Sequence, residues 1–393
     1  MSDELFIDGF GPLPVRRPNT VAEVCDLVRE VRTAGQGVYP VGGRTTLDLG
    51  NVPTKPGIAV DTRSLNGVIE HAARDMTITV QAGITLAELA KVLAAENQWL
   101  PIDVPNPETA TLGGAVAANV SGPRRLGHGT FRDYILGISF VTDDGVEVKG
   151  GGRVVKNVAG YDLMKLHTGA LGTLGVITQV TLKVKPKPEA TGLVTFGVGG
   201  AALGPTLDRL HASESRPVAV EVSRSADGWL VACGFEEKAA TVNWQVETLK
   251  AEFAGAPVRG TTVTRDGGVF DLTAGPPPVA AVTLKVNTTP SGVAVIAQAA
   301  AGLNPDAVVS AHAGSGIVFV HLPEEMGVER ISSAVAELTK LTAANGNVTV
   351  RRCPSGWKKV LPVWGKDRGD RELMRTVKRT LDPDDVFNPG RLV

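Results

Sequence analysis

Cysteine is scarce in this sequence, and its scarcity argues against two kinds of metal site. The 393 residues include three cysteines, which lie far apart: Cys25, Cys233 and Cys353. No CxxC pair is present, so we expect neither a structural zinc site nor an iron–sulfur cluster held by this chain. Three widely spaced thiols fit a reducing cytoplasmic compartment better than a secreted, disulfide-bonded protein.

An excess of charge and a long apolar run are also missing. The sequence has 40 basic and 41 acidic residues, which gives a net charge of -1. It therefore lacks the excess of positive charge that is typical of a nucleic-acid-binding protein. No apolar run approaches the roughly 18 residues that a membrane-spanning helix needs. The N-terminus lacks the basic flank and apolar stretch of a signal peptide. We therefore expect a cytoplasmic protein, with any membrane contact made through a partner.

Glycine and chain length are what the sequence has in abundance. Its 46 glycines fit many tight turns and close approaches of the backbone to a ligand. A chain this long, with 43% hydrophobic residues, predicts two or three domains. The charged, proline-rich stretch Lys183–Pro188 predicts the first boundary. We expect a first domain over 1–187, a second over 188–350, and a segment over 351–393 that returns to the first.

Local patterns predict an α+β protein. Thr20 and Thr85 each precede a Glu by three residues, the signature of a capping box that opens a helix. The first domain is predicted to hold short strands at 38–41, 58–61, 77–80, 136–141 and 176–184. The second is predicted to hold strands at 191–198, 217–223, 228–235, 279–286, 307–312 and 316–321. Its predicted helices are 205–213, 238–253, 291–302 and 328–344. This order indicates roughly two βαβ-type repeats with antiparallel pairing, as in ferredoxin-like domains, joined near Gly275–Pro278.

The loop Gly42-Gly43-Arg44-Thr45-Thr46 follows one of the predicted strands. Its two glycines let the backbone approach a ligand closely, and successive N–H groups can form a nest for an anion. The threonine hydroxyls add further donors, so a diphosphate is the natural guest. Taken alone, the loop could equally be an ordinary glycine turn.

Two further glycine blocks lie downstream. Ala110–Asn119 is apolar and small, and a flat ring or a diphosphate could lie against Gly113 and Gly114, which have no Cβ. Gly172–Thr178 is a glycine turn that leads into a strand, whose main chain could pair with the edge of a ring. A tightly packed helix and a plain turn–strand step are the alternatives for these blocks taken singly.

Together with Lys156–Leu163 and the tail Phe387–Arg391, these blocks resemble the flavoprotein family that includes vanillyl-alcohol oxidase and the FAD-linked D-2-hydroxyacid dehydrogenases. The resemblance implies a PCMH-type FAD-binding domain of two subdomains and a ferredoxin-like α/β cap domain. Some relatives attach FAD to a histidine in the glycine loop; Arg44 stands there in this sequence, so noncovalent FAD is expected. By resemblance, the cofactor-binding residues are Pro40, Gly42, Gly43, Arg44, Thr45, Thr46, Thr111, Gly113, Gly114, Asn119, Gly122, Gly175 and Ile177.

A narrower resemblance concerns Ser121–Arg125, followed by Gly129 and Arg132-Asp133-Tyr134. This pattern is similar to the FAD-binding E subunits of bacterial glycolate oxidase, also called glycolate dehydrogenase. The resemblance implies a subunit that helps oxidise glycolate to glyoxylate, beside a catalytic FAD subunit and an iron–sulfur subunit that receives the electrons. A self-sufficient FAD-linked 2-hydroxyacid dehydrogenase, acting for example on D-lactate, and a non-catalytic scaffold subunit remain as alternatives.

One motif departs from the family pattern. Catalytic relatives carry H-A-G-D-G-N-x-H, whereas this chain has His312–Phe319, in which Ser315 replaces the Asp, Ile317 the Asn and Phe319 the second His. A single histidine with no carboxylate beside it does not hold a divalent metal. We therefore expect no metal site, and interpret His312 as a buried or strand-end histidine.

Oxidation of a 2-hydroxyacid needs a base for the hydroxyl proton and a cation for the carboxylate. The sequence assigns no catalytic base, with His128 in the Gly127–Gly129 turn as the one alternative. The candidate cations are Arg351, Arg352, Lys358 and Arg368. For each of the four, we expect solvation at the surface instead.

Overall fold

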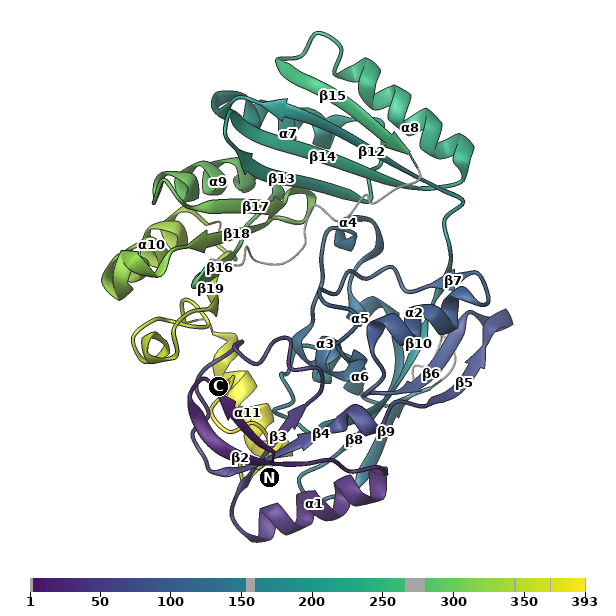
Figure 1. Ribbon diagram of the computed structural model, residues 1–393, viewed down its shortest axis with the longest axis vertical. Coiled ribbons are helices and arrows are strands. Elements are labelled where there is room, and N and C mark those ends of the chain that lie inside the picture. The colour runs from purple at the N-terminus through teal and green to yellow at the C-terminus, as the bar shows by residue number, and fades with distance from the viewer. Residues whose placement is uncertain (1–2, 153–159, 266–279, 343, 368, 393) are drawn as a thin grey trace. The chain divides into compact units, whose positions relative to one another are not determined.

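The computed structural model describes residues 3–152, 160–265, 280–342, 344–367 and 369–392 (Figure 1). The Lys156–Ala159 part of the family motif, the joint Gly275–Pro278 and Arg368 lie outside these ranges. The chain forms two compact units. The first unit comprises Met1–Ser121, Thr130–Lys187 and Asp367–Val393, and the second comprises Gly122–Gly129 and Pro188–Lys366.

The first unit holds two main sheets. The four-stranded sheet has the order β1-β2-β4-β3, with β4 parallel to both of its neighbours. The five-stranded sheet has the order β5-β6-β10-β8-β9 and is antiparallel throughout. The strands of these two sheets and of a small two-stranded third sheet are β1 Glu4–Ile7, β2 Phe10–Arg16, β3 Gly37–Val41, β4 Gly57–Asp61, β5 Val68–Ala72, β6 Thr77–Gln81, β7 Gln98–Trp99, β8 Ile135–Val141, β9 Glu147–Gly151, β10 Val176–Lys183 and β11 Lys185–Pro186. The longer helices are α1 Val21–Thr33, α2 Leu86–Ala94, α3 Leu112–Ala118 and α11 Asp370–Leu381, and the short ones are α5 Phe131–Tyr134 and α6 Leu163–His167.

Both predicted helix starts of the first unit are confirmed. Thr85 and Glu88 form a reciprocal capping box at the start of α2. At α1, the Thr20 hydroxyl accepts a hydrogen bond from the Glu23 N–H at 3.2 Å, while the Glu23 carboxylate accepts from the preceding Asn19 N–H. The apolar faces of these helices then pack into cores with the two sheets: α1 with β3, β4, β8 and β10, and α2 and α3 with β6, β8 and β10.

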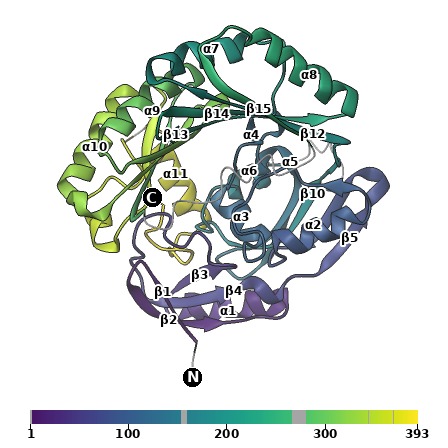
Figure 2. The ribbon, with the colours of Figure 1, turned by 45° about the horizontal axis from the view of Figure 1, so that its top comes forward.

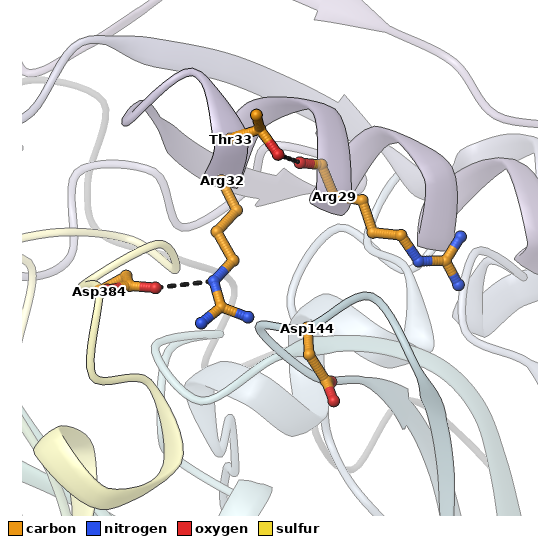
Figure 3. A pocket seen from close by; sticks show the side chains of 5 residues that line it. All are labelled: Arg29, Arg32, Thr33, Asp144 and Asp384. Carbon is orange, nitrogen blue, oxygen red and sulfur yellow. Dashed lines mark hydrogen bonds and ion pairs between the residues drawn. The ribbon is translucent and has the colours of Figure 1, made fainter.

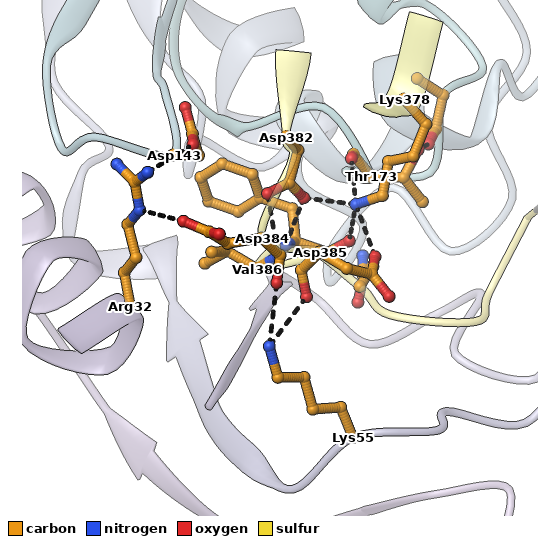
Figure 4. A network of polar contacts seen from close by, with 12 residues as sticks. Arg32, Lys55, Asp143, Thr173, Lys378, Asp382, Asp384, Asp385 and Val386 are labelled. Carbon is orange, nitrogen blue, oxygen red and sulfur yellow. Dashed lines mark hydrogen bonds and ion pairs between the residues drawn. The ribbon is translucent and has the colours of Figure 1, made fainter. Parts of the chain in front are cut away.

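The C-terminal segment is held in the first unit by a buried ion-pair network (Figure 4). Asp382 is buried; its carboxylate accepts hydrogen bonds from the Val386 and Phe387 N–H groups, each at 2.8 Å, and pairs with Lys378. The Lys378 ammonium also donates to the Thr173 carbonyl at 3.0 Å. Phe387 is completely buried in the core beneath α1. Residues near the end of the chain thus complete the core begun by α1.

The second unit is one eight-stranded antiparallel sheet with four long helices on one face (Figure 2). Its strands are β12 Ala190–Val198, β13 Ala219–Ser225, β14 Gly228–Glu237, β15 Val258–Arg265, β16 Val282–Asn287, β17 Val308–His312, β18 Ile317–Leu322 and β19 Asn347–Arg352. Its helices are α4 Arg125–His128, α7 Leu203–Ala212, α8 Ala239–Glu252, α9 Val293–Gly302 and α10 Gly327–Leu341.

The strand order β15-β12-β14-β13-β17-β18-β16-β19 shows that the sheet is a duplication. Each half runs strand–helix–strand–strand–helix–strand, the ferredoxin-like arrangement. The two halves meet where β13 pairs with β17, with Val222 opposite Ala311. The predicted pair of repeats is therefore confirmed. Side chains alternate between the two faces of the sheet along each strand. The helices cover one face, and the opposite face is called the polar face below.

Candidate cofactor and substrate sites

The glycine loop, Gly42–Thr46, follows β3 directly and offers a row of backbone donors. Within the described ranges, no N–H from Gly43 through Thr46 donates to a backbone carbonyl. Arg44 has a φ of 60°, and a left-handed residue in such a turn is what directs successive N–H groups toward one anion. A Cβ on Gly43 would lie 1.8 Å from the Thr109 carbonyl oxygen, so only glycine lets the loop lie against that backbone.

The Arg44 side chain is anchored by a buried carboxylate. Its guanidinium lies 3.5 Å from Asp61, which is fully buried and also pairs with Arg63 and Arg17. Burial alone would raise the pKa of Asp61, but hydrogen bonds from Arg63 and the nearby guanidinium charges hold that pKa below its ordinary value. Arg17 also pairs with Asp3, so three guanidinium groups face two carboxylates and leave a net positive charge near the glycine loop. Such a field favours a diphosphate.

Gly113 and Gly114 have different surroundings at the start of α3. A Cβ on Gly113 would lie 2.8 Å from the Ala82 Cβ, so Gly113 allows the helix to pack on the neighbouring backbone. Gly114 is exposed, and its Cβ would meet only the Thr111 hydroxyl, at 3.2 Å. That hydroxyl accepts the Gly114 N–H and caps the helix. Of the two glycines, Gly114 therefore has the open side on which a ring could lie.

The blocks that are distant in sequence meet in the first unit. A Cβ on Gly42 would overlap the Thr111 side chain, which places the glycine loop against the start of α3. The Leu171 N–H donates to the Ala117 carbonyl at 2.8 Å, which places the loop before β10 against the end of α3. Asn388 then links the tail to both sides: its side chain donates to the Leu171 carbonyl at 2.6 Å and its N–H to β3 at 2.9 Å.

The remaining predicted cofactor residues fall into two groups. Pro40 lies in β3, where its ring would contact a Cβ on Gly172 at 3.5 Å. Gly175 precedes β10 with a φ of 151°, and Ile177 pairs with Phe140 of β8. These residues belong to the first unit, with the glycine loop and α3. Gly122 belongs to the second unit.

Three buried polar atoms of the first unit have no hydrogen-bond partner among the described residues. They are Arg44 Nε, Asn119 Oδ1 and Thr178 Oγ1. Such atoms are rare in folded proteins, because an unpaired buried polar group is costly. Each belongs to one of the converging blocks: the glycine loop, the end of α3 and the start of β10. The glycine loop offers N–H donors for phosphate oxygens, and the unpaired atoms can bond a ring or a ribityl chain. Together these groups fit FAD. Thr178 was not predicted as a site residue, although it ends the motif Gly172–Thr178.

The polar face of the second unit carries a lysine between positive charges. Lys285 lies on β16 and is half-buried, and no ion pair to it is found within the described ranges. Burial, reinforced by the charges of Arg351 and Arg125, lowers the pKa of Lys285 to about 7. An anion beside Lys285 would offset the burial and the positive charges that lower its pKa. Neither Lys285 nor Arg125 was among the predicted cations.

His312 is paired with a carboxylate, contrary to the sequence expectation. Glu221 stands opposite His312 across the β13–β17 pair, and its two carboxylate oxygens lie 2.8 and 3.0 Å from His312 Nδ1. Both side chains are largely buried, at 9% and 12% exposure. The Phe319 ring packs edge-on against the imidazole, with centroids 5.2 Å apart. The sequence could not place Glu221 there, because 91 residues separate the pair.

Other predicted candidates are buried or hydrogen-bonded within the second unit. His128, the alternative base, lies 3.2 Å from the buried Glu236 carboxylate, which also accepts from Arg124 at 2.8 Å. Lys358 is buried, not solvated as expected, because it lies in a 3-10 turn packed after β19. His321 is buried against the Thr283 hydroxyl at 3.0 Å, and burial lowers its pKa to about 4.

The structure also bears on a metal centre and contains a pocket elsewhere in the first unit. Within the described ranges, no group of three or more His, Cys, Asp or Glu side chains is placed to hold a metal ion. A pocket of about 440 Å³ in the first unit is lined by Arg29, Arg32, Thr33, Asp144 and Asp384 (Figure 3). Arg32 pairs there with Asp384 at 2.7 Å. This pocket shares no residue with the converging blocks, so we do not assign the cofactor to it.

Comparison with known proteins adds independent evidence. Residues 12–151 match the family model of the FAD binding domain, and residues 278–392 match that of the FAD linked oxidases, C-terminal domain. Glycolate oxidase subunit GlcE of Escherichia coli (strain K12) is 40% identical over 136 residues, which is 34% of this chain and 39% of that protein. Glycolate oxidase subunit GlcD of Bacillus subtilis (strain 168) is 32% identical over 174 residues, 44% of this chain and 36% of that protein. D-lactate dehydrogenase of Archaeoglobus fulgidus is 35% identical over 173 residues, 44% of this chain and 39% of that protein.

The matched segments thus span less than half the length of these curated relatives. Among solved structures, alkyldihydroxyacetonephosphate synthase superposes with a TM-score of 0.70 at 19% identity, covering 96% of this chain and 77% of that one. This likeness establishes the fold: a PCMH-type FAD-binding domain with a ferredoxin-like α/β domain. The two family models together span well over half of the sequence and include the glycine loop, α3 and the C-terminal tail. The chain therefore belongs to the FAD-linked oxidase family, and its cofactor is FAD.

Proposed function

We propose that this chain is the FAD-binding subunit of a glycolate oxidase, or glycolate dehydrogenase, complex. In this proposal the complex oxidises glycolate to glyoxylate and passes the electrons to an iron–sulfur partner subunit, beside a catalytic FAD subunit. The observation that carries the proposal is the convergence of the glycine loop, α3 and the start of β10 in one unit, each with an unpaired buried polar atom, in a chain that belongs to the FAD-linked oxidase family. The cationic cluster of Lys285, Arg125 and Arg351 in the second unit supports a small anion as the substrate. The relatives named glycolate oxidase subunits support the choice of substrate.

The cationic cluster is suited to a small carboxylate. A half-buried lysine near two guanidinium groups favours an anion, because a negative charge offsets the burial and the repulsion that lower its pKa. Arginine adds planar, paired donors that match carboxylate geometry. In this proposal, the carboxylate of a small 2-hydroxyacid binds at this cluster.

In the first unit, we propose that the predicted residues hold FAD noncovalently. The glycine loop N–H groups and Arg44 would bind the diphosphate, and Gly114, Asn119 and Thr178 would line the flavin and ribityl part. Bound FAD supplies a two-electron acceptor for oxidation of the hydroxyacid carbon. Because arginine forms no bond to flavin, acid precipitation of the protein should leave all the flavin in the supernatant; flavin retained in the pellet would contradict noncovalent binding.

An anaerobic absorbance titration with glycolate tests the function. The purified chain is loaded with FAD, and the oxidised flavin band is followed before and after partner subunits are added. A stable yellow band that bleaches only with the partners supports the subunit assignment. Bleaching of the chain alone favours a self-sufficient FAD-linked 2-hydroxyacid dehydrogenase, for which D-lactate is the matched second substrate. A chain that stays colourless with FAD supplied would leave the non-catalytic scaffold.

A further inference from the structure

The segment that contains the glycine loop has no helix or strand of its own. It runs from Gly42 to Pro56, between β3 and β4, and lies wholly within the described residues. Its own backbone supplies a hydrogen bond from the Leu49 N–H to the Thr46 carbonyl, at 3.2 Å. A long loop with little regular structure is held mainly by what packs against it. In the first unit, the C-terminal tail packs against this segment.

The main chain of the tail bonds directly to this segment. The Asn51 N–H donates to the Arg391 carbonyl at 3.0 Å, and the Thr54 N–H donates to the Pro389 carbonyl at 3.1 Å. Between these two tail residues, Gly390 has a φ of 82°, and a Cβ there would lie 2.5 Å from the Thr54 methyl carbon. Only glycine therefore lets the tail lie so close to the segment.

The Arg391 side chain, which is 6% exposed, collects the carbonyl groups of the same segment. Its Nη1 donates to the Asp8 carboxylate at 2.7 Å and to the Asn51 carbonyl at 2.6 Å. Its Nη2 donates to the Leu47 carbonyl at 2.5 Å and to the Leu49 carbonyl. Each terminal nitrogen of a guanidinium carries two N–H groups, so all four are used. Because Leu47 directly follows the glycine loop, Arg391 fixes the chain at the end of that loop.

We propose that Arg391 is a positioning residue for FAD, which keeps the N–H groups of the glycine loop directed at one diphosphate. The inference rests on the proposed placement of FAD at that loop. Arg391 and Asp8 are neutral as a pair, so Arg391 acts through the shape of the loop and not by attracting phosphate. Donors that are ordered before binding hold an anion more tightly, since binding does not have to order them. By linkage, bound FAD stabilises the docked tail in return.

The test measures the dissociation constants of FAD and of ADP, which carries the diphosphate without the flavin, for apoprotein variants. Arg391→Met should weaken both ligands by the same factor, about 5-fold to 150-fold, the usual range for two coupled events. Asp8→Asn combined with Arg391→Met should show the same loss, although it leaves no unpaired carboxylate to repel a phosphate. Arg391→Lys should lie between, because one ammonium cannot reach all four acceptors. Arg29→Met is the matched control, since Arg29 donates to the Gly145 carbonyl in the turn between β8 and β9, and should stay near wild type.

Hydrogen–deuterium exchange separates positioning from general stability. In the wild type, FAD should slow exchange of the Asn51 and Thr54 amides, which bond to the tail. In Arg391→Met apoprotein these amides should exchange faster while the amides of β8 keep their protection. A merely structural role would instead speed exchange throughout the first unit and leave the FAD dissociation constant of the folded protein unchanged. If Arg391→Met misfolds, Gly390→Ala, which keeps every charge and presses the tail away from Thr54, should show the same loss of FAD and ADP affinity.

The possible failures are distinguishable. Wild-type protein that binds FAD without protecting any amide of residues 42–56 overturns the placement of FAD at the glycine loop, and the role of Arg391 with it. Protection of that segment, with FAD and ADP affinities unchanged in Arg391→Met, overturns the role of Arg391 and leaves the placement standing. Affinity restored by adding Asp8→Asn would mean simple charge repulsion and would also overturn it. None of these outcomes depends on whether glycolate bleaches the flavin, so a failure of the proposed substrate is detected separately.

Discussion

At the scale of single residues, the two glycines of α3 can be told apart experimentally. Gly114→Val places a branched side chain on the exposed side that we assign to FAD, where only the Thr111 hydroxyl lies within 4 Å. We expect flavin content to fall at least tenfold while the thermal unfolding curve of the apoprotein changes little. The measurement is the flavin-to-protein absorbance ratio after reconstitution.

Gly199→Ala is a suitable control, because no atom lies within 4 Å of the added Cβ. Gly113→Val should behave differently from both, since its Cβ would press on Ala82 and destabilise the whole unit. Full flavin content in folded Gly114→Val would remove α3 from the cofactor site.

Lys285 connects stability to pH with a defined sign. An unfolded lysine holds its proton to a pH of about 10, whereas burial and the charges of Arg351 and Arg125 lower the pKa of folded Lys285 to about 7. Between these values the unfolded chain binds the extra proton, so folding stability rises with pH across this window and the charged lysine destabilises the fold below it. Lys285→Met should therefore raise the melting temperature of apoprotein most at pH 6 and least at pH 9.

Lys285→Met should also weaken the binding of oxalate, a non-oxidisable dicarboxylate used in place of the substrate. Because an anion favours the protonated ammonium, oxalate binding by the wild type should take up protons at pH 8, and its affinity should fall as the pH rises above about 7. Calorimetry in buffers of different ionisation enthalpy measures this uptake. A stability gain in Lys285→Met that does not vary with pH, together with unchanged oxalate affinity, would contradict the assignment of this residue.

At the scale of elements, the C-terminal segment is predicted to be part of the core of the first unit. Lys378 of α11 is largely buried, with 12% of its side chain exposed, and its partner Asp382 has none. Lys378→Met would leave the Asp382 carboxylate buried without a cation. Losing one partner of a buried pair typically costs about 3–5 kcal/mol, so we expect a matching fall in the free energy of unfolding in urea.

Arg375→Met on the exposed side of α11 is the control, because its ion pair with Glu372 is solvated and worth little. If Lys378→Met were as mild as this control, the network of Figure 4 would not hold the segment in place.

The elements themselves show what the sequence could and could not provide. Strands such as β12 and β14 are short, mainly apolar runs and were predicted to within a few residues. The strands β15 and β19, each at an edge of the sheet, were missed. Edge strands need fewer inward apolar residues, and their pattern is correspondingly weaker.

Sites that depend on pairing between distant strands were beyond sequence reasoning. The glycine loop and α3 could be identified because short motifs carry them. The contact between Glu221 and His312 arises only because the two repeats join through β13 and β17. The cationic cluster combines residues of α4, β16 and β19, which no local pattern brings together.

At the scale of the whole molecule, the chain has separate hydrophobic cores. Among the described residues, one core unites the helix-covered face of the eight-stranded sheet and three others belong to the first unit, while Leu193 and Ala232 form a small further cluster in the second unit. No helix in the described ranges combines the length and apolar character needed to cross a membrane. FAD is assigned to the first unit and the small carboxylate to the second. The two ligands should therefore stabilise different parts of the molecule.

Differential scanning calorimetry of the apoprotein should resolve two unfolding transitions, because cores that share no residues can unfold independently. FAD at 100 times its dissociation constant should add about 2.7 kcal/mol to the unit that binds it and shift one transition upward. Oxalate should shift the other, and Lys285→Met should abolish that second shift while leaving the response to FAD intact. A single transition that both ligands shift equally would mean that the two units unfold as one cooperative body, and the separate assignment of ligands would then have to rest on the Gly114→Val and Lys285→Met variants alone.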